Sequence, residues 1–176
     1  VLRGEGPREG EPFIDDHIWT TEPIVDYLTQ FSGIQPDDLD PKRTQRTLVS
    51  HKTAYKKLRM LTDLGCRFIG HGLAKDFRII NIFVPPSQVI DTVQLYHSPA
   101  HPRNLSLRFL SWFLLKKDIQ QGLALGVEQH DGHDSIEDAL AALQLFRKYE
   151  QFERDGRLED MLEDLYEICL LYTSLS

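Results

Sequence analysis

Apolar residues occur along this chain in two patterns, as short runs and as longer stretches with helical spacing. A helix over residues 44–64 is predicted by apolar side chains that recur close to every helical turn, at Leu48, Tyr55, Leu58, Leu61 and Leu64. By the same criterion, with capping residues and glycine stops, further helices are predicted over residues 22–31, 76–81, 105–115, 134–152 and 158–168. Short strands are predicted over residues 1–3, 12–15, 67–71 and 89–91.

Strands that alternate with helices predict an α/β fold. Four short strands are few for this number of apolar helices, so we expect that N-terminal strands of the sheet are missing from this chain. A length of 176 residues fits one domain. We place that domain at residues 1–169 and treat residues 170–176 as a tail, because they show no polar helix face.

The composition sets limits but does not assign a function. Hydrophobic residues make up 41% and charged residues 27%, which excludes disordered and fibrous classes. No apolar run is long enough for a membrane helix, so no membrane partner is expected. Cys66 and Cys169 are too few for a disulfide framework, which favours reduced thiols in the cytosol or nucleus. The net charge of −7 argues against a passive nucleic-acid binder, yet it is compatible with metal-dependent nucleases, which need clustered carboxylates.

The first candidate site follows the predicted strand at residues 67–71. The sequence there continues as Gly70-His71-Gly72-Leu73 and then Lys75-Asp76-Phe77. Active groups of α/β proteins gather at the carboxyl ends of strands, where His71 and Asp76 would lie. A structural interpretation remains open, in which the glycines serve the turn and Asp76 caps a helix.

The second candidate site begins the helix predicted at residues 134–152. His133 precedes the helix and Asp138 lies in its first turns, so both can face one site. A histidine there can accept a proton from water while the aspartate holds a cation. The alternative is a capped helix with solvent-facing acids, in which Asp134 is the cap and Glu137 completes a capping box.

The order and spacing of these motifs resemble the DEDD superfamily of 3′–5′ exonucleases. More closely, the chain is similar to the nuclease domains of the catalytic subunits of poly(A)-nuclease deadenylation complexes. The resemblance extends over nearly the whole chain and is carried by residues 12–16, 25–34, 70–73, 75–78, 106–110 and 133–139. It implies a ribonuclease H-like exonuclease fold, with a mixed sheet flanked by helices.

The resemblance also implies roles for individual residues. In the family, four carboxylates bind two divalent cations, Mg²⁺ or Mn²⁺, and a histidine activates the attacking water. The matching positions assign metal binding to Asp76 and Asp138 and the general base to His133. A sister subgroup carries a tyrosine four residues before the last aspartate. That position is Asp134 here, so the chain matches the histidine subgroup.

One part of the family pattern is absent. The first family motif, Asp-x-Glu on the central strand, occurs nowhere in the 176 residues. We expect it upstream of Val1, and Asp15 and Asp16 do not replace it, because that segment lies outside the family's metal site. The isolated chain is therefore expected to be inactive, while its parent shortens mRNA poly(A) tails and releases AMP. The alternatives are a non-catalytic interaction module on a nuclease fold, or a relative that degrades short oligoribonucleotides or DNA.

Weaker signals concern substrate and partners. We expect His71, Ser106 and Arg108 to contact substrate. Basic residues without any acid between Pro41 and Thr62 can follow an RNA backbone, although a solvated helix face is favoured. The resemblance implies as partners poly(A) RNA, a pseudokinase-like adaptor subunit and, through it, poly(A)-binding protein. It also implies a location in the cytoplasm, including mRNA-decay granules, or in the nucleus.

Overall fold

The computed structural model describes residues 1–119 and 134–174. Two parallel two-stranded sheets lie in this part of the chain. In one, β1 (Asp16–Trp19) pairs with β2 (Thr47–Ser50), and in the other β3 (Phe68–Gly70) pairs with β4 (Val89–Asp91). The α/β class is therefore confirmed.

Seven helices are described besides short 3₁₀ and π segments. They are α1 (Thr29–Ser32), α2 (His51–Asp63), α3 (Ala74–Ile80), α4 (Thr92–Leu95), α5 (Leu107–Leu110), α6 (Ser135–Arg154) and α7 (Leu158–Ser174). The 3₁₀ helices lie at Pro36–Leu39 and Pro86–Gln88, and a π-helical segment, Ser111–Leu115, continues α5. None of the described helices is long and apolar enough to cross a bilayer.

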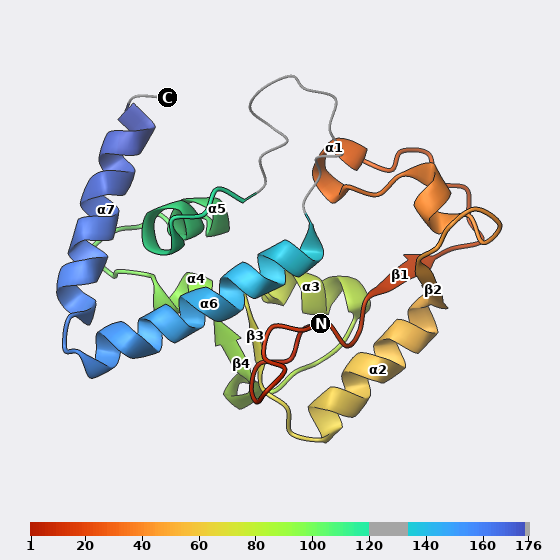
Figure 1. Ribbon diagram of the computed structural model, residues 1–176, viewed down its shortest axis with the longest axis horizontal. Coiled ribbons are helices and arrows are strands. Elements are labelled where there is room, and N and C mark those ends of the chain that lie inside the picture. The colour runs from red at the N-terminus through yellow and green to blue at the C-terminus, as the bar shows by residue number, and fades with distance from the viewer. Residues whose placement is uncertain (120–133, 175–176) are drawn as a thin grey trace.

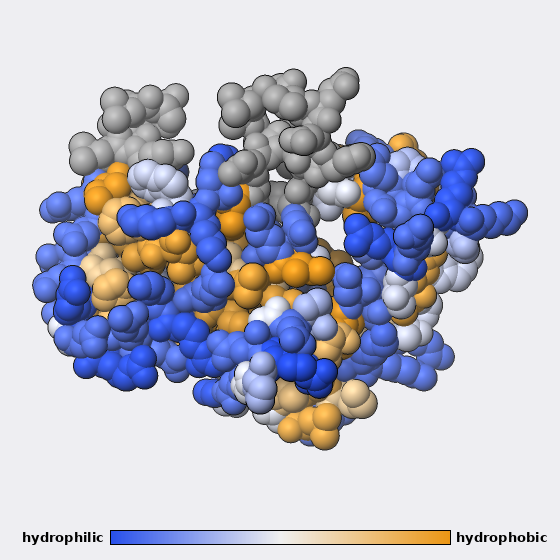
Figure 2. Space-filling view, in the orientation of Figure 1, coloured by the Kyte–Doolittle hydropathy of each residue, from blue (hydrophilic) through white to orange (hydrophobic). Residues whose placement is uncertain are grey.

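The sheet of β3 and β4 lies between two unequal parts (Figure 1). On one side α4, α5, α6 and α7 surround the hydrophobic core, in which Leu110, Leu145 and Leu165 are fully buried. On the other side β1, β2 and α2 form a thinner unit that leaves Ile18 and Trp19 well exposed. Figure 2 shows the same contrast, since hydrophobic residues gather over the centre and left while hydrophilic residues cover much of the remaining surface.

Several predicted elements are confirmed because strong local signals define them. The strands at 67–71 and 89–91 appear as β3 and β4, and the helices at 76–81, 105–115 and 134–152 appear at nearly the predicted bounds. The carboxylate of Asp134 caps α6 by accepting a hydrogen bond from the Ile136 N–H at 2.8 Å. The last predicted helix, 158–168, continues to Ser174, past the residue at which we placed the end of the domain.

The helix predicted over residues 22–31 is wrong except at its end. Asp26 accepts a hydrogen bond from the Leu28 N–H at 2.8 Å, which forms a local turn that competes with a helix. Leu28 itself has a left-handed backbone, with φ of 48°. Only Thr29–Ser32 is helical, and Gly33 ends it with φ of 69° as expected.

The helix predicted over residues 44–64 begins seven residues late, at His51. Thr47–Ser50 is instead the strand β2, which pairs with β1. Its β-branched residues, Thr47 and Val49, favour an extended backbone over a helix. Ser50 ends the strand and caps α2 by accepting from the Thr53 N–H at 3.2 Å. The apolar spacing identified the helix, but the cap determines where it begins.

The N-terminal segment also differs from expectation. The strand expected at 12–15 lies instead at Asp16–Trp19, and Pro12 forms only an isolated antiparallel bridge with Leu2. The segment is held to α6 by Arg147, whose guanidinium donates to the Gly4 carbonyl at 2.7 Å and to Glu9 Oε2 at 3.0 Å. These bonds place the first residues of the chain beside its penultimate helix.

Candidate active site

The turn that joins β3 to α3 has a tightly constrained backbone at its two glycines. Gly70 has no room for a side chain, since a Cβ there would lie 2.7 Å from Leu73 Cγ. Gly72 has a left-handed backbone, with φ of 80°, which favours glycine. Both glycines therefore serve the turn, and His71 is held between them.

A carboxylate from the neighbouring strand closes this turn. Asp91, the last residue of β4, accepts hydrogen bonds from the Gly72 N–H at 2.8 Å and from the Leu73 N–H at 3.0 Å. The same carboxylate caps α4 by accepting from the Val93 N–H at 3.0 Å. Asp91 thus joins the ends of both strands of this sheet, and nothing in our sequence analysis assigned it a role.

His71 points into this network. Its Nδ1 lies 2.9 Å from Thr92 Oγ1, and that hydroxyl donates to the Gly70 carbonyl at 3.0 Å. Burial lowers the pKa of His71, and this effect exceeds the opposing influence of the Asp91 and Asp138 charges and of the Leu105 carbonyl. His71 is therefore neutral at pH 7 and is held by the protein itself.

Asp76 lies in the first turn of α3 and is exposed. Displacement of water around its carboxyl raises its pKa, and the negative charge of Asp91 adds to this increase, while its own backbone N–H opposes it. A cation beside this carboxylate would favour the ionised form. The positive charge of Lys75 already acts on this carboxyl in that direction.

Asp138 approaches the same place from another element. It lies in the first turn of α6, a helix that packs against β3 and runs across the centre of the molecule (Figure 1). Its charge acts on His71, as the charge of Asp91 acts on both His71 and Asp76. The structure therefore links Asp76 and Asp138 to a shared polar region around His71 and Asp91.

His133 lies outside the described residues, so its role as general base stays a prediction. The metal-binding roles of Asp76 and Asp138 also stay predictions, and their donor chemistry fits hard cations such as Mg²⁺ and Mn²⁺. Within residues 1–119 and 134–174, no group of three or more His, Cys, Asp or Glu side chains is arranged to hold a metal ion. Asp76 and Asp138 therefore stay predicted ligands, and a complete cation site is not found among the described residues.

The other predicted substrate contacts lie beside this region. Ser106 is exposed and caps α5, where its hydroxyl accepts from the Phe109 N–H at 3.2 Å. Arg108 Nε lies 3.3 Å from Asp118 Oδ1. Leu105, whose carbonyl acts on His71, directly precedes Ser106, so the start of α5 adjoins the candidate site. Contact of either side chain with substrate stays a prediction.

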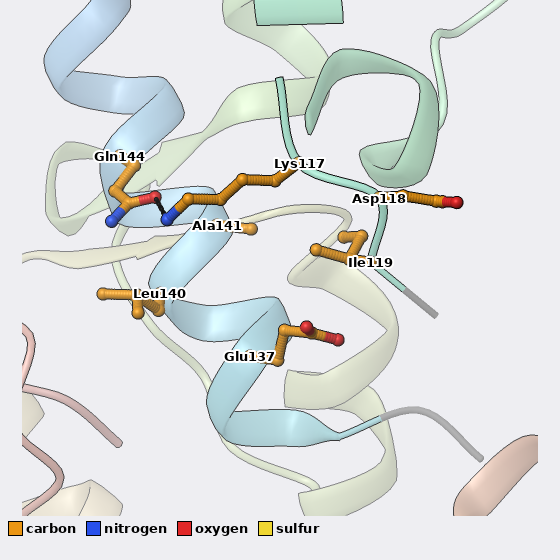
Figure 3. A pocket seen from close by; sticks show the side chains of 7 residues that line it. All are labelled: Lys117, Asp118, Ile119, Glu137, Leu140, Ala141 and Gln144. Atoms are coloured by element: carbon orange, nitrogen blue, oxygen red, sulfur yellow. Dashed lines mark hydrogen bonds between the residues drawn. The ribbon is translucent and has the colours of Figure 1, made fainter. Parts of the chain in front are cut away.

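A pocket of about 310 Å³ opens next to the first turns of α6 (Figure 3). It is lined by Lys117, Asp118, Ile119, Glu137, Leu140, Ala141 and Gln144. Lys117 Nζ donates to Gln144 Oε1 at 2.9 Å across it. Asp138 does not line this pocket although it neighbours Glu137 in sequence, so the pocket lies on a different face of α6 from the candidate cation site.

The basic stretch before Thr62 is mostly neutralised by acids from neighbouring segments. Ion pairs join Lys57 to Asp16 at 2.6 Å, Arg59 to Asp63 at 2.7 Å, Arg43 to Asp37 at 2.9 Å and Arg46 to Asp38 at 3.8 Å. The stretch is also divided between a loop, β2 and α2 rather than lying on one helix. This arrangement favours the interpretation as a solvated, internally paired surface over an RNA track.

Comparison with known proteins gives consistent results. The Exonuclease family (RNase_T) matches residues 1–146. The chain is 58% identical over 168 residues to the catalytic subunit PAN2 of the PAN2-PAN3 deadenylation complex of Chaetomium globosum, covering 96% of this chain and 14% of that protein. The corresponding subunit of Schizosaccharomyces pombe is 52% identical over 168 residues, covering 96% of this chain and 15% of that protein. The chain thus spans about a seventh of the length of these relatives.

Solved structures show the same similarity in three dimensions. The Neurospora crassa Pan2 catalytic unit, with protease and nuclease domains, superposes with a TM-score of 0.86 at 57% identity, covering 94% of this chain and 26% of that one. A Saccharomyces cerevisiae Pan2 pseudoubiquitin hydrolase-RNA exonuclease module in complex with A7 RNA gives a TM-score of 0.87 at 42% identity, covering 98% of this chain and 27% of that one. With a family match over most of its length and a fold shared with these modules, the chain belongs to the exonuclease family.

Proposed function

We propose that this chain is the nuclease domain of a metal-dependent 3′–5′ exoribonuclease that shortens mRNA poly(A) tails and releases AMP. The observation that carries the proposal is the 52–58% identity to deadenylation catalytic subunits over 96% of the chain. The charges of Asp91 and Asp138 act on His71, and the charge of Asp91 acts on Asp76, which supports it. The relative bound to A7 RNA supports the choice of adenosine-rich substrate.

The chemistry assigns one task to each residue. Asp76 and Asp138 would hold two divalent cations, Mg²⁺ or Mn²⁺, together with two carboxylates of an Asp-x-Glu motif that this sequence does not contain. When bound, such cations lower the pKa of water and stabilise charge on the phosphate. His133 accepts the proton of the attacking water. His71, neutral and engaged with Thr92, adds no positive charge to this region.

The 176-residue chain alone is proposed to be inactive, because two of the four cation ligands are absent from it. A non-catalytic interaction module is the second candidate, and the absence of Asp-x-Glu from the sequence favours it. The two candidates differ in what precedes Val1 in the longer parent protein. An Asp-x-Glu on an apolar strand there supports the enzyme, and its absence supports the module.

Partners and location follow the relatives. We infer that the parent assembles with a pseudokinase-like adaptor subunit and, through it, approaches poly(A)-binding protein. The naming of relatives for a PAN2-PAN3 complex supports an adaptor of this kind. A location in the cytoplasm, including mRNA-decay granules, or in the nucleus agrees with such a role.

The test uses the longer parent protein and an RNA with a 3′ run of adenosines. Wild type should release AMP in the presence of Mn²⁺, and Asp138→Asn should abolish release while leaving the fold intact. His133→Ala should bind Mn²⁺ normally yet lose roughly 10²–10⁴ in rate. Substrates of mixed sequence and of DNA measure the preference for adenosine.

Three outcomes contradict the proposal. The first is full activity in Asp138→Asn, and the second is an equal loss of Mn²⁺ affinity in both variants, which would contradict the separate roles. The third is Mn²⁺-dependent tail shortening by the isolated 176-residue chain, which would contradict its proposed inactivity.

A further inference from the structure

The β3–α3 turn is held locally by backbone alone, through bonds such as that from the Lys75 N–H to the Gly72 carbonyl at 3.2 Å. Leu73 is the N-cap of α3, and its side chain makes no capping hydrogen bond. Gly72, just before it, adopts a backbone with φ of 80°, and glycine loses more conformational freedom on folding than other residues. Asp76 projects from the first turn of α3, so its position depends on whatever holds this turn.

Side-chain hydrogen bonds to the turn come from Asp91 and Thr92, which lie on the neighbouring strand and at the start of the helix after it. Asp91 caps α4 with one carboxylate oxygen, which accepts a hydrogen bond from the Val93 N–H. That single bond is enough for the cap. The bonds from Gly72 and Leu73 are additional, and they reach residues 18 and 19 positions away in sequence. Three backbone N–H groups thus donate to this carboxylate, two of them to Oδ1 and one to Oδ2, so it holds the backbone of both segments.

Thr92 holds the other half of the turn. It is fully buried, and its hydroxyl lies within hydrogen-bonding distance of both the Gly70 carbonyl and His71 Nδ1. A carbonyl can only accept, so the single hydroxyl hydrogen goes to Gly70 and His71 Nδ1 must donate. Asp91 and Thr92 together hold all four residues of the turn, Gly70 to Leu73.

We propose that Asp91 and Thr92 are positioning residues that fix the carboxylate of Asp76 and the ring of His71 through the turn at residues 70–73. This inference rests on the proposed function, in which Asp76 holds a cation. Metal ligands must keep their distances within about 0.2 Å, and residues that orient ligands typically change metal affinity by about 10–100-fold when they are altered. Asp91 and Thr92 supply the side-chain bonds that this turn and the uncapped start of α3 do not make themselves.

The experiment compares four variants of the longer parent protein. Asp91→Asn replaces one carboxylate oxygen by an NH₂ that cannot accept, Thr92→Val removes the hydroxyl at nearly constant shape, and Thr92→Ser restores it. Ser50→Ala is the matched control, because Ser50 also ends a strand and caps a helix but bonds only within its own segment. Mn²⁺ binding is measured by titration calorimetry without RNA, and KM for RNA is measured at saturating Mn²⁺.

We expect Asp91→Asn and Thr92→Val to weaken Mn²⁺ binding about 10-fold or more, with KM for RNA unchanged. Thr92→Ser and Ser50→Ala should bind Mn²⁺ as wild type does. Hydrogen exchange of the Gly72 and Leu73 amides should be faster in Asp91→Asn, since these N–H groups lose a charged acceptor. That last measurement depends on neither metal nor activity.

Wild-type Mn²⁺ affinity in both Asp91→Asn and Thr92→Val overturns the inference, and so does an equal weakening in Ser50→Ala, which would indicate a general loss of stability. Failure of the proposed function gives a different result, in which wild type itself does not shorten the RNA or Asp138→Asn retains activity. If Asp91→Asn does not fold, the comparison of Thr92→Val with Thr92→Ser decides the question alone.

Discussion

The two small sheets of this protein have the same topology but differ in what their strand ends do. In each, two parallel strands pair, and the later strand runs directly into a helix through a capping residue, Ser50 for β2 and Asp91 for β4. The Ser50 side chain bonds to Thr53, three residues on. Asp91 also reaches the neighbouring strand's turn, where His71 and Asp76 lie.

The two ends therefore differ in chemistry, although both are carboxyl ends of parallel strands, where the active groups of α/β proteins gather. The end of the β1–β2 sheet has an apolar surface at Ile18 and Trp19, both well exposed. The end of the β3–β4 sheet has a hydrogen-bonded network around the buried Thr92. What distinguishes the candidate site is a set of long-range polar contacts that fix a turn.

The largest expected effect tests the two capping residues against each other. Asp91→Ala leaves three backbone N–H groups without an acceptor and should lower the free energy of unfolding by about 3 kcal/mol. Ser50→Ala removes a single capping bond and should cost about 1 kcal/mol. Urea unfolding of both variants measures the difference, and equal losses would show that the bonds across the sheet add nothing.

A somewhat smaller effect is expected from the tight packing inside the turn. Gly70→Ala places a Cβ against Leu73 and should cost about 1–3 kcal/mol. The double variant Gly70→Ala with Leu73→Ala removes the clash, so it should be less destabilised than the sum of the single changes. Gly4→Ala, where a Cβ would meet Ile69 only at 3.9 Å, should leave the unfolding midpoint unchanged.

The β1–β2 side can be probed through its ion pair. Lys57 Nζ lies 2.6 Å from Asp16 Oδ2, and the Asp16 side chain is only 9% exposed. Lys57→Met leaves that carboxylate without its partner, so we expect a loss of about 1–2 kcal/mol in urea unfolding. Arg59→Met breaks the exposed pair with Asp63 and should cause no measurable change. A similar result for both variants would show that burial of Asp16 does not strengthen its pair.

The smallest effect is a pH dependence that belongs only to the β3–β4 side. Because burial lowers the pKa of His71, the unfolded chain binds its proton more readily than the folded chain does. The contribution of His71 to stability is therefore present above its unfolded pKa of about 6.5 and is lost as pH falls through that value. Urea unfolding gives the free energy of unfolding of wild type and of His71→Gln at each pH. The difference between these two free energies should be smaller at pH 5.5 than at pH 7.5. A difference that widens instead would mean that the folded pKa is raised.

The sequence predicted β3, β4 and α6 well because local signals define each of them, namely apolar runs beside turn residues and the Asp134 cap. It failed at residues 22–28, where the local turn made by Asp26 outweighs helical spacing. It also missed β2, whose extended form depends on pairing with β1, which lies some 30 residues earlier. Pairing of that kind leaves little trace in a local pattern.

The candidate site shows the same limit. Asp76 could be found because it follows a glycine turn at the end of a strand, and Asp138 because it follows a capped helix start. Asp91 and Thr92 could not be found in this way. An aspartate at the start of a helix looks the same in sequence whether it caps that helix alone or also bonds to a turn 18 residues earlier. Only the fold distinguishes the two cases.

The attachment of the N-terminal segment to Arg147 has a consequence for how this protein forms during synthesis. Glu9 emerges from the ribosome long before Arg147, which lies 138 residues later. The bonds to Arg147 can therefore form only after α6 has been made, and such distant contacts form slowly because a long loop must close first. The N-terminal segment can therefore dock fully against α6 only after the last quarter of the chain has been translated.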